Sequence, residues 1–157
     1  KYAIVYNNRG IAYAKKGDND QAIKDYNKAI ELDSQYADAY SNRATAFEME
    51  MEYEKALMDY NDAIRLNPQG GDTYFKRAYF FANQNNFELA LVDYTKAIEL
   101  MPMNADAYHN RGFVYYKLKK YNKALDDFAK ALEINPSHKM ARIAYDELKK
   151  ALAEQKQ

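Results

Sequence analysis

The sequence predicts an all-α protein made of four consecutive helix–turn–helix units followed by a ninth helix. The first observation is that "YNNRG" at 6–10 returns as "YSNRA" at 40–44, "YFKRA" at 74–78 and "YHNRG" at 108–112, always 34 residues further on. The second is that apolar residues within each copy follow helical spacing in two stretches that a polar break separates. One hairpin cannot bury both of its faces, so the copies are expected to stack on their neighbours.

The repeat units span residues 3–36, 37–70, 71–104 and 105–138. In the first unit, Tyr6, Gly10 and Tyr13 lie at i, i+4 and i+7 and mark the first helix. Ala22, Tyr26 and Ala29 mark the second helix in the same way. The breaks inside the units are "KKGDND", "EMEMEYE", "NQNN" and "KLKK". Between units, the sequences "LDSQ", "LNPQGG", "LMPMN" and "INPSH" end the preceding helix, three of them through a proline.

The tail from residue 139 to residue 157 predicts a capping helix over the open end of the last hairpin. Its apolar stripe is expected to consist of Met140, Ile143, Ala144, Leu148, Ala151 and Leu152. No comparable polar cap precedes Tyr2, so we expect the natural protein to continue upstream. The whole of 1–157 is therefore interpreted as a single repeat domain.

These residues resemble the tetratricopeptide repeat (TPR) family, whose pattern is W-x2-L-G-x2-Y…A-x3-F…P with a period of 34. The likeness covers residues 3–138, with three departures. Tyr stands for Trp in every copy, Ser34 replaces the first proline, and Arg stands where the pattern has Leu. The resemblance implies a right-handed α–α superhelix (solenoid) whose concave groove is lined by the first helices and binds extended peptides or partner helices.

Composition excludes several classes of protein. Lys plus Arg and Asp plus Glu both total 23, and this neutrality argues against a nucleic-acid partner. Cysteine is absent, and no apolar run approaches the roughly 18 residues needed to insert into a membrane. The charge is uneven, however. Residues 37–70 hold three Lys or Arg and seven Asp or Glu, so their net charge is −4. Residues 105–157 hold eleven Lys or Arg and seven Asp or Glu, so their net charge is +4.

The recurring arginine is interpreted as structural. Its position in the helical stripe is at least half-buried, and a buried arginine needs a partner. Every copy supplies an aspartate just before the aromatic residue of its second helix, at a height that an antiparallel hairpin brings next to the arginine. The expected pairs are Arg9–Asp25, Arg43–Asp59, Arg77–Asp93 and Arg111–Asp127.

The sequence carries no catalytic signature, so the chain is not expected to be an enzyme. Its two histidines lie in separate elements without a nucleophile or metal-ligand set around them, and no Gly-rich phosphate loop is present. We therefore expect neither a metal nor a cofactor.

A peptide-binding groove is predicted along the first helices, where an amide recurs one residue before the arginine. Asn8, Asn42 and Asn110 can each pair with a peptide C=O and N–H together, whereas the third copy has Lys76. This row resembles the asparagine ladder of TPR arrays that hold extended peptides. An aromatic patch accompanies it in the last two copies: Phe75, Tyr79, His109, Phe113 and Tyr116.

The predicted function is a non-catalytic protein–protein interaction scaffold. Its ligand would be a protein or peptide with an acidic or C-terminal carboxylate group near Lys76. The chaperone-type carboxylate clamp is not expected, because Asp72 brings the wrong charge to one of its five positions. Two alternatives stay open: a self-assembling structural module, either a head-to-tail homo-oligomer or a dimer, and the docking segment of a larger enzyme.

Overall fold

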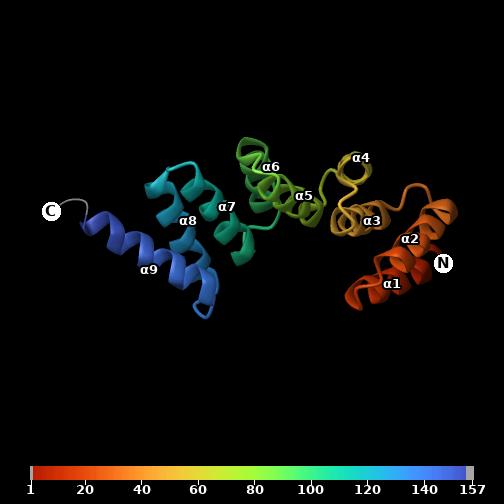
Figure 1. Cartoon of the computed structure of the whole chain (residues 1–157), viewed down its shortest axis with the longest axis horizontal. Coiled ribbons are helices and arrows are strands. Elements are labelled where there is room, and N and C mark those ends of the chain that lie inside the picture. The colour runs from red at the N-terminus through yellow and green to blue at the C-terminus, as the bar shows by residue number, and fades with distance from the viewer. Residues whose placement is uncertain (1, 155–157) are drawn as a thin grey trace. The chain divides into compact units, whose positions relative to one another are not determined.

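A computed structural model describes residues 2–154, and this part of the chain forms nine α-helices (Figure 1). Their bounds are α1 Tyr2–Lys15, α2 Asn19–Leu32, α3 Ala37–Met49, α4 Tyr53–Leu66, α5 Gly71–Asn83, α6 Phe87–Leu100, α7 Ala105–Lys117, α8 Tyr121–Ile134 and α9 Lys139–Glu154. The first eight helices form the four predicted hairpins. The last three residues of the predicted capping helix, 155–157, lie outside the described residues.

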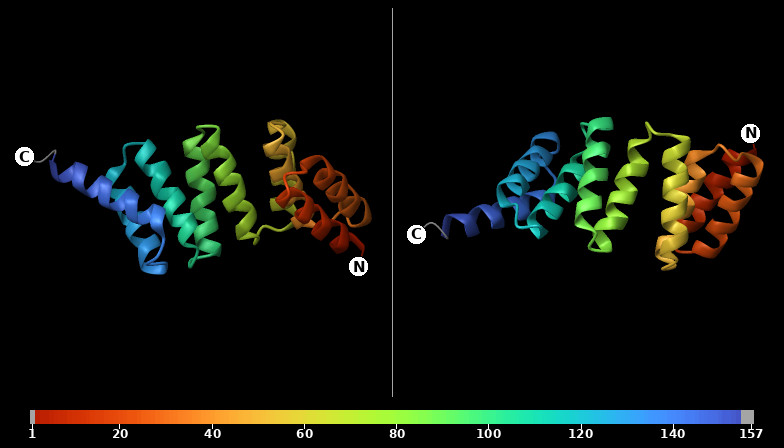
Figure 2. Two further views of the ribbon diagram at one scale, coloured as in Figure 1. Left: turned by 60° about the horizontal axis from the view of Figure 1, so that its bottom comes forward. Right: turned by 90° about the horizontal axis from the view of Figure 1, so that it is seen from above.

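Contacts group the chain into two compact units, Lys1–Lys76 and Arg77–Gln157. In the first unit, α1 packs on α2, α3 packs on α4, and α2 also contacts α3. In the second unit, α7 packs on α8 and contacts α6, and α9 covers α8, as both views of Figure 2 show for the last three helices. The division falls within α5, so Lys76 belongs to the first unit. The single domain over 1–157 stays a prediction.

Every first helix ends in the same way. The residue after its last turn is left-handed, with φ of 81° at Gly17, 60° at Met51, 58° at Asn85 and 57° at Lys119. The next residue returns a backbone hydrogen bond to the helix, as Glu52 N–H does to the carbonyl of Phe47. These are the bonds of the Schellman motif, which reverses the chain into the second helix. Glycine and asparagine suit this conformation, whereas methionine and lysine adopt it at a cost.

The core contains one large ring from each second helix. Tyr26, Tyr60, Tyr94 and Phe128 are all at most 2% exposed. A small residue of the first helix lies opposite each ring, and its small size lets the two helices pack closely. A Cβ added at Gly10 would lie 2.6 Å from Cε1 of Tyr26, so the missing side chain lets α1 approach α2.

The face that α9 buries differs from the predicted stripe. Ala141 and Leu148 are buried, and Tyr145 packs beside them against the last hairpin. Met140 and Ile143 are 61% and 51% exposed, and Ala151 is exposed as well, so the prediction was wrong for these three residues. The small Ala141 lets the start of α9 lie close to α8, and this contact turns the neighbouring Met140 toward solvent.

Other apolar residues are exposed at the beginning of the first unit, namely Tyr2, Ile4 and Val5. Between residues 2 and 154, no helix combines the length and the apolar character needed to cross a lipid bilayer.

Candidate functional site

The repeated arginines form two-pronged ion pairs inside the hairpins. In each pair, arginine Nε and Nη2 donate to the two carboxylate oxygens of the aspartate that follows 16 residues later. The distances are 2.6–2.9 Å for Arg9–Asp25, Arg43–Asp59, Arg77–Asp93 and Arg111–Asp127. The aspartate side chains are only 4–8% exposed. This parallel geometry is the strongest form of the Arg–carboxylate contact.

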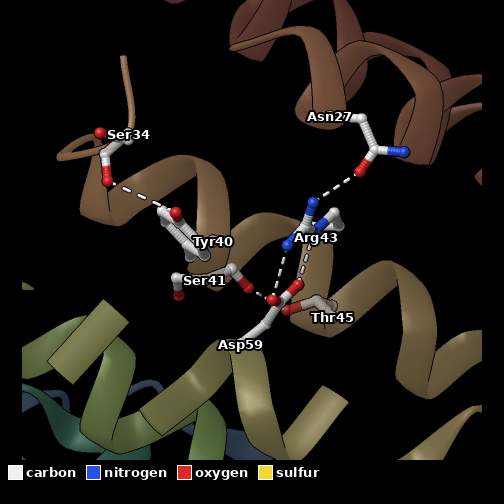
Figure 3. A network of polar contacts seen from close by, with 7 residues as sticks. All are labelled: Asn27, Ser34, Tyr40, Ser41, Arg43, Thr45 and Asp59. Carbon is white, nitrogen blue, oxygen red and sulfur yellow. Dashed lines mark hydrogen bonds and ion pairs between the residues drawn. The ribbon is translucent and has the colours of Figure 1, made fainter. Parts of the chain in front are cut away.

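Arg43 and Arg111 also connect neighbouring repeats. Arg43 Nη1 donates to the side-chain oxygen of Asn27 at 2.6 Å, so one guanidinium joins α2, α3 and α4 (Figure 3). Arg111 Nη1 donates to Thr95 Oγ1 at 3.3 Å in the second unit, and the hydrogen bond with Asp127 raises the pKa of Arg111. These contacts occupy the guanidinium groups within the protein.

The predicted amide row takes a different path through the first unit. Asn42 Nδ2 donates to Asn7 Oδ1 at 3.1 Å, and Asn7 Nδ2 donates to the Tyr36 hydroxyl at 3.2 Å. Asn7 is 3% exposed, whereas Asn8 faces solvent. The repeat pattern predicts Asn8 because it precedes the arginine, whereas Asn7, the amide that contacts Asn42, is not among the predicted residues. Asn110 lies half-buried in the second unit.

Lys76 extends this chain of polar contacts. Its ammonium donates to Asn42 Oδ1 at 3.2 Å and forms an ion pair with Asp72 Oδ2 at 2.7 Å. The lysine side chain is 29% exposed, and that of Asp72 is 68% exposed. Asp72 stands four residues before Lys76, a spacing that predicts such a pair on a helix. The result is a continuous polar chain, defined here as Tyr36, Asn7, Asn42, Lys76 and Asp72.

Two recesses border the polar chain. The polar one has a volume of about 440 Å³ and is lined by Asn7, Asn8, Ile11, Tyr36, Asp38, Ser41, Asn42, Asp72 and Lys76. The apolar one measures about 370 Å³ and is lined by Ile11, Ala14, Lys15, Gly17, Asn19, Tyr26, Asn42, Thr45, Ala46, Met49 and Lys76. They share Ile11, Asn42 and Lys76, so the two recesses adjoin. Ser41 Oγ, in the polar recess, is buried without a hydrogen-bond partner among the described residues.

The predicted aromatic patch is only partly exposed. Tyr79, Phe113 and Tyr116 are 45–50% exposed, and Phe75 is half-buried. His109 packs inward, with ring centroids 5.7 Å from Phe128 and 4.9 Å from His138. Its Nδ1 is buried and has no hydrogen-bond partner in the described part of the chain.

The packing of His109 predicts a pH effect on stability. Burial and the neighbouring His138 lower the pKa of His109 from its usual value of about 6.5, although Asp106 opposes this. The unfolded chain therefore binds this proton more readily. The stabilisation is complete above the unfolded pKa and is lost as the pH falls through the folded pKa. We expect urea unfolding to show this loss below about pH 6.5.

The matched variant is His109→Phe, because Phe75 occupies the equivalent place in the third repeat. It should flatten the pH dependence in this window without changing the loss at lower pH, where carboxylates titrate. NMR titration of the His109 ring reads the pKa directly. A ring that titrates at or above 6.5 would refute the assignment.

The geometry described so far defines an α-helical repeat protein in which a recurring ion pair holds each hairpin and the surface carries polar and apolar recesses. One family model, of the tetratricopeptide repeat, matches residues 37–69 and 105–138. A second family model, of the TPR repeat, matches residues 10–49 and 80–119. This chain belongs to the tetratricopeptide repeat family.

Solved structures show the same fold. Pseudomonas aeruginosa pilF gives a TM-score of 0.92 at 26% identity, over 97% of this chain and 69% of that one. The Arabidopsis OM64 TPR domain gives a TM-score of 0.68 at 32% identity, over 73% of this chain and 94% of that domain. MamA gives a TM-score of 0.81 at 21% identity, over 96% of this chain and 82% of that one. At that identity the likeness shows the fold alone. The comparison with curated proteins gives no match.

The all-α prediction is therefore confirmed as a TPR superhelix fold of paired helices. TPR domains generally bind proteins and typically serve as protein–protein interaction modules. The fold is usually non-catalytic, and no catalytic family is identified for this chain.

Proposed function

We propose that this chain is a non-catalytic protein-binding module whose first unit holds an extended peptide along α1, α3 and the start of α5. The observation that carries the proposal is the polar chain from Tyr36 to Asp72, which crosses these three helices and borders two adjoining recesses. Polar groups fixed beside an apolar hollow are typical of sites that recognise a ligand.

The backbone of the ligand would pair with amides. A carboxamide has two N–H donors and two acceptor positions. Asn42 uses one donor toward Asn7 and one acceptor position toward Lys76, so one of each is left for a peptide unit. The exposed Asn8 offers a second carboxamide to the same ligand. Such contacts grip a backbone with little regard to its sequence.

Lys76 would supply the selectivity. Its ammonium has three donors, and Asn42 and Asp72 occupy two of them. A ligand carboxylate, either acidic or C-terminal, would take the place of the exposed Asp72. An apolar side chain next to that carboxylate would enter the 370 Å³ recess beside Ile11 and Met49. Charge complementarity of this kind sets selectivity and on-rate more than total affinity.

The remaining predicted groove residues stay predictions. Phe75 belongs to the first unit, and Tyr79, His109, Asn110, Phe113 and Tyr116 belong to the second. For the exposed rings among them, Tyr79, Phe113 and Tyr116, contact with apolar side chains of a peptide stays a prediction from the sequence.

Substitutions at Lys76 and Asp72 are expected to change the peptide affinity in opposite directions. Lys76→Glu should weaken binding of acidic peptides selected from a random library by roughly tenfold, about 1.4 kcal/mol. Asp72→Asn should tighten it, because the variant frees the ammonium for the ligand. Lys76→Asn should complete the amide row and broaden the range of accepted sequences. Fluorescence anisotropy with the selected peptides measures all three.

The matched control is Asp38→Asn, which removes an equal charge from the same recess at the equivalent position of the preceding repeat. It should change the affinity less than Asp72→Asn does. If wild type and the Lys76 variants select the same peptides with equal affinity, Lys76 is an ordinary surface lysine and the proposed site is wrong.

A further inference from the structure

The turn between α3 and α4 presents apolar side chains to solvent together with Glu50 and Glu54, whereas Glu48 and Glu52 are half-buried. Its sequence, "EMEMEYE" at residues 48–54, alternates glutamates with Met49, Met51 and Tyr53. Met49 and Met51 are 65% and 74% exposed, and Tyr53 is 36% exposed. We call residues 48–54 the methionine–glutamate turn. Flexible, polarizable methionines on a surface are typical of protein-docking sites.

Local structure does not require methionine here. Met51 is the left-handed residue of the Schellman motif, with φ of 60°. The first and third repeats use Gly17 and Asn85 at this place, and both suit that conformation better. The fold therefore tolerates Met51 rather than needing it.

The second unit carries a surface of opposite charge at the equivalent end of its last hairpin. A recess of about 320 Å³ between α7 and α9 is lined by Phe113, Tyr116, Phe128, Ala144, Glu147, Leu148 and Ala151. A neighbouring recess of about 380 Å³ is lined by Lys119, Lys120, Tyr121, Asn122, Lys123 and Leu152. The rings of Tyr116 and Tyr121 connect the two at a centroid distance of 5.8 Å. We call them together the lysine–aromatic surface.

We propose that the methionine–glutamate turn of one molecule docks on the lysine–aromatic surface of a second copy of this chain. Met51 would enter the recess between Phe113 and Tyr116, since thioether sulfur packs favourably against aromatic rings. Glu50, which accepts a hydrogen bond from Asn19, and Glu52, which pairs with Lys55, would exchange these partners for Lys119 and Lys120 of the second copy.

Charge selects a second copy as the occupant. Residues 37–70 have a net charge of −4 and residues 105–157 a net charge of +4, in a chain that is neutral as a whole. Two copies therefore attract through these surfaces without net repulsion between the molecules. The contact joins two different surfaces, so it is heterologous and produces either a ring or an open chain of copies. It does not involve Lys76. The turn shares only Met49 with the apolar recess of the first unit, and Phe113 and Tyr116 also belong to the predicted aromatic patch, so the variants below avoid these three residues.

The test exchanges the charges. Sedimentation velocity of the wild type should show mass that rises with protein concentration and falls with added salt. Glu50→Lys with Glu52→Lys should raise the dissociation constant about a hundredfold, because like charges then face each other. Lys119→Glu with Lys120→Glu should do the same. An equimolar mixture of the two double variants should assemble again, since every contact then pairs opposite charges.

The apolar half of the contact has its own variants. Met51→Asn installs the residue that the third repeat uses, so it should preserve the thermal melting temperature while raising the dissociation constant at least about tenfold. Met58→Gln is the control, because Met58 is 66% exposed on α4 outside the turn. It should leave assembly unchanged.

A wild type that stays monomeric at every concentration overturns the proposal, as does a mixture of the charge-reversed variants that fails to assemble. Equal effects of Met51→Asn and Met58→Gln would also overturn it. Peptide binding by the same variants is measured in parallel. Loss of assembly with peptide affinity unchanged separates this surface from the Lys76 site.

Discussion

Asp59→Ala is expected to lower the free energy of unfolding by about 3–5 kcal/mol, the usual cost of breaking a buried ion pair. The variant leaves the Arg43 guanidinium, which is 18% exposed, without its main acceptor. The guanidinium carbon Cζ of Arg43 lies 5.5 Å from the ring centroid of Tyr40 and 5.7 Å from that of Phe47. Because these rings hold the guanidinium, it cannot easily turn toward water. Urea unfolding followed by circular dichroism measures the loss.

The first repeat provides a matched position. Asp25 accepts the same two hydrogen bonds, but its partner Arg9 is 57% exposed and can be hydrated when the aspartate is removed. We therefore expect Asp25→Ala to cost less than Asp59→Ala.

A double-mutant cycle completes this test. Replacing both Arg43 and Asp59 should cost less than the sum of the single losses, and the cycle at Arg77 and Asp93 should behave alike. Additive losses would mean that the pairs contribute no coupling energy, contrary to their geometry.

Tyr60→Ala is the second change with a large expected effect, about 3–5 kcal/mol of unfolding free energy. The Tyr60 ring is 1% exposed and fills the space between α3 and α4. Its removal leaves a cavity that the two helices can close only in part, because Ala44 and Ala56 already stand at their contact with no exposed surface.

The control is Tyr60→Phe, which keeps the ring and removes the hydroxyl. That hydroxyl lies 3.1 Å from Thr45 Oγ1 and donates to Glu48 Oε2 at 3.2 Å, so its loss should cost about 1 kcal/mol. Phe128 fills the equivalent place in the fourth repeat, which shows that the fold accepts this ring. Similar losses for the two variants would mean that the hydroxyl, and not the ring, holds this hairpin.

The sequence by itself determined the elements whose causes are local and repeated. Helical spacing places the hairpins, and the 34-residue period marks where each begins, because equivalent residues meet equivalent neighbours in every copy. The Arg–Asp pairs follow for the same reason. An arginine and an aspartate that recur 16 residues apart face each other whenever the hairpin closes.

The tertiary structure alone decided which side of each helix faces its neighbours. Residues next to each other in a helix point about 100° apart, so a small rotation exchanges one for the other. This rotation buries Asn7 instead of Asn8, exposes Met140 beside the buried Ala141, and turns His109 toward Phe128. It also brings Lys76 to Asn42, a residue 34 positions earlier in the chain. Packing between helices sets that rotation, and the periodicity of one helix does not define it to within a single residue.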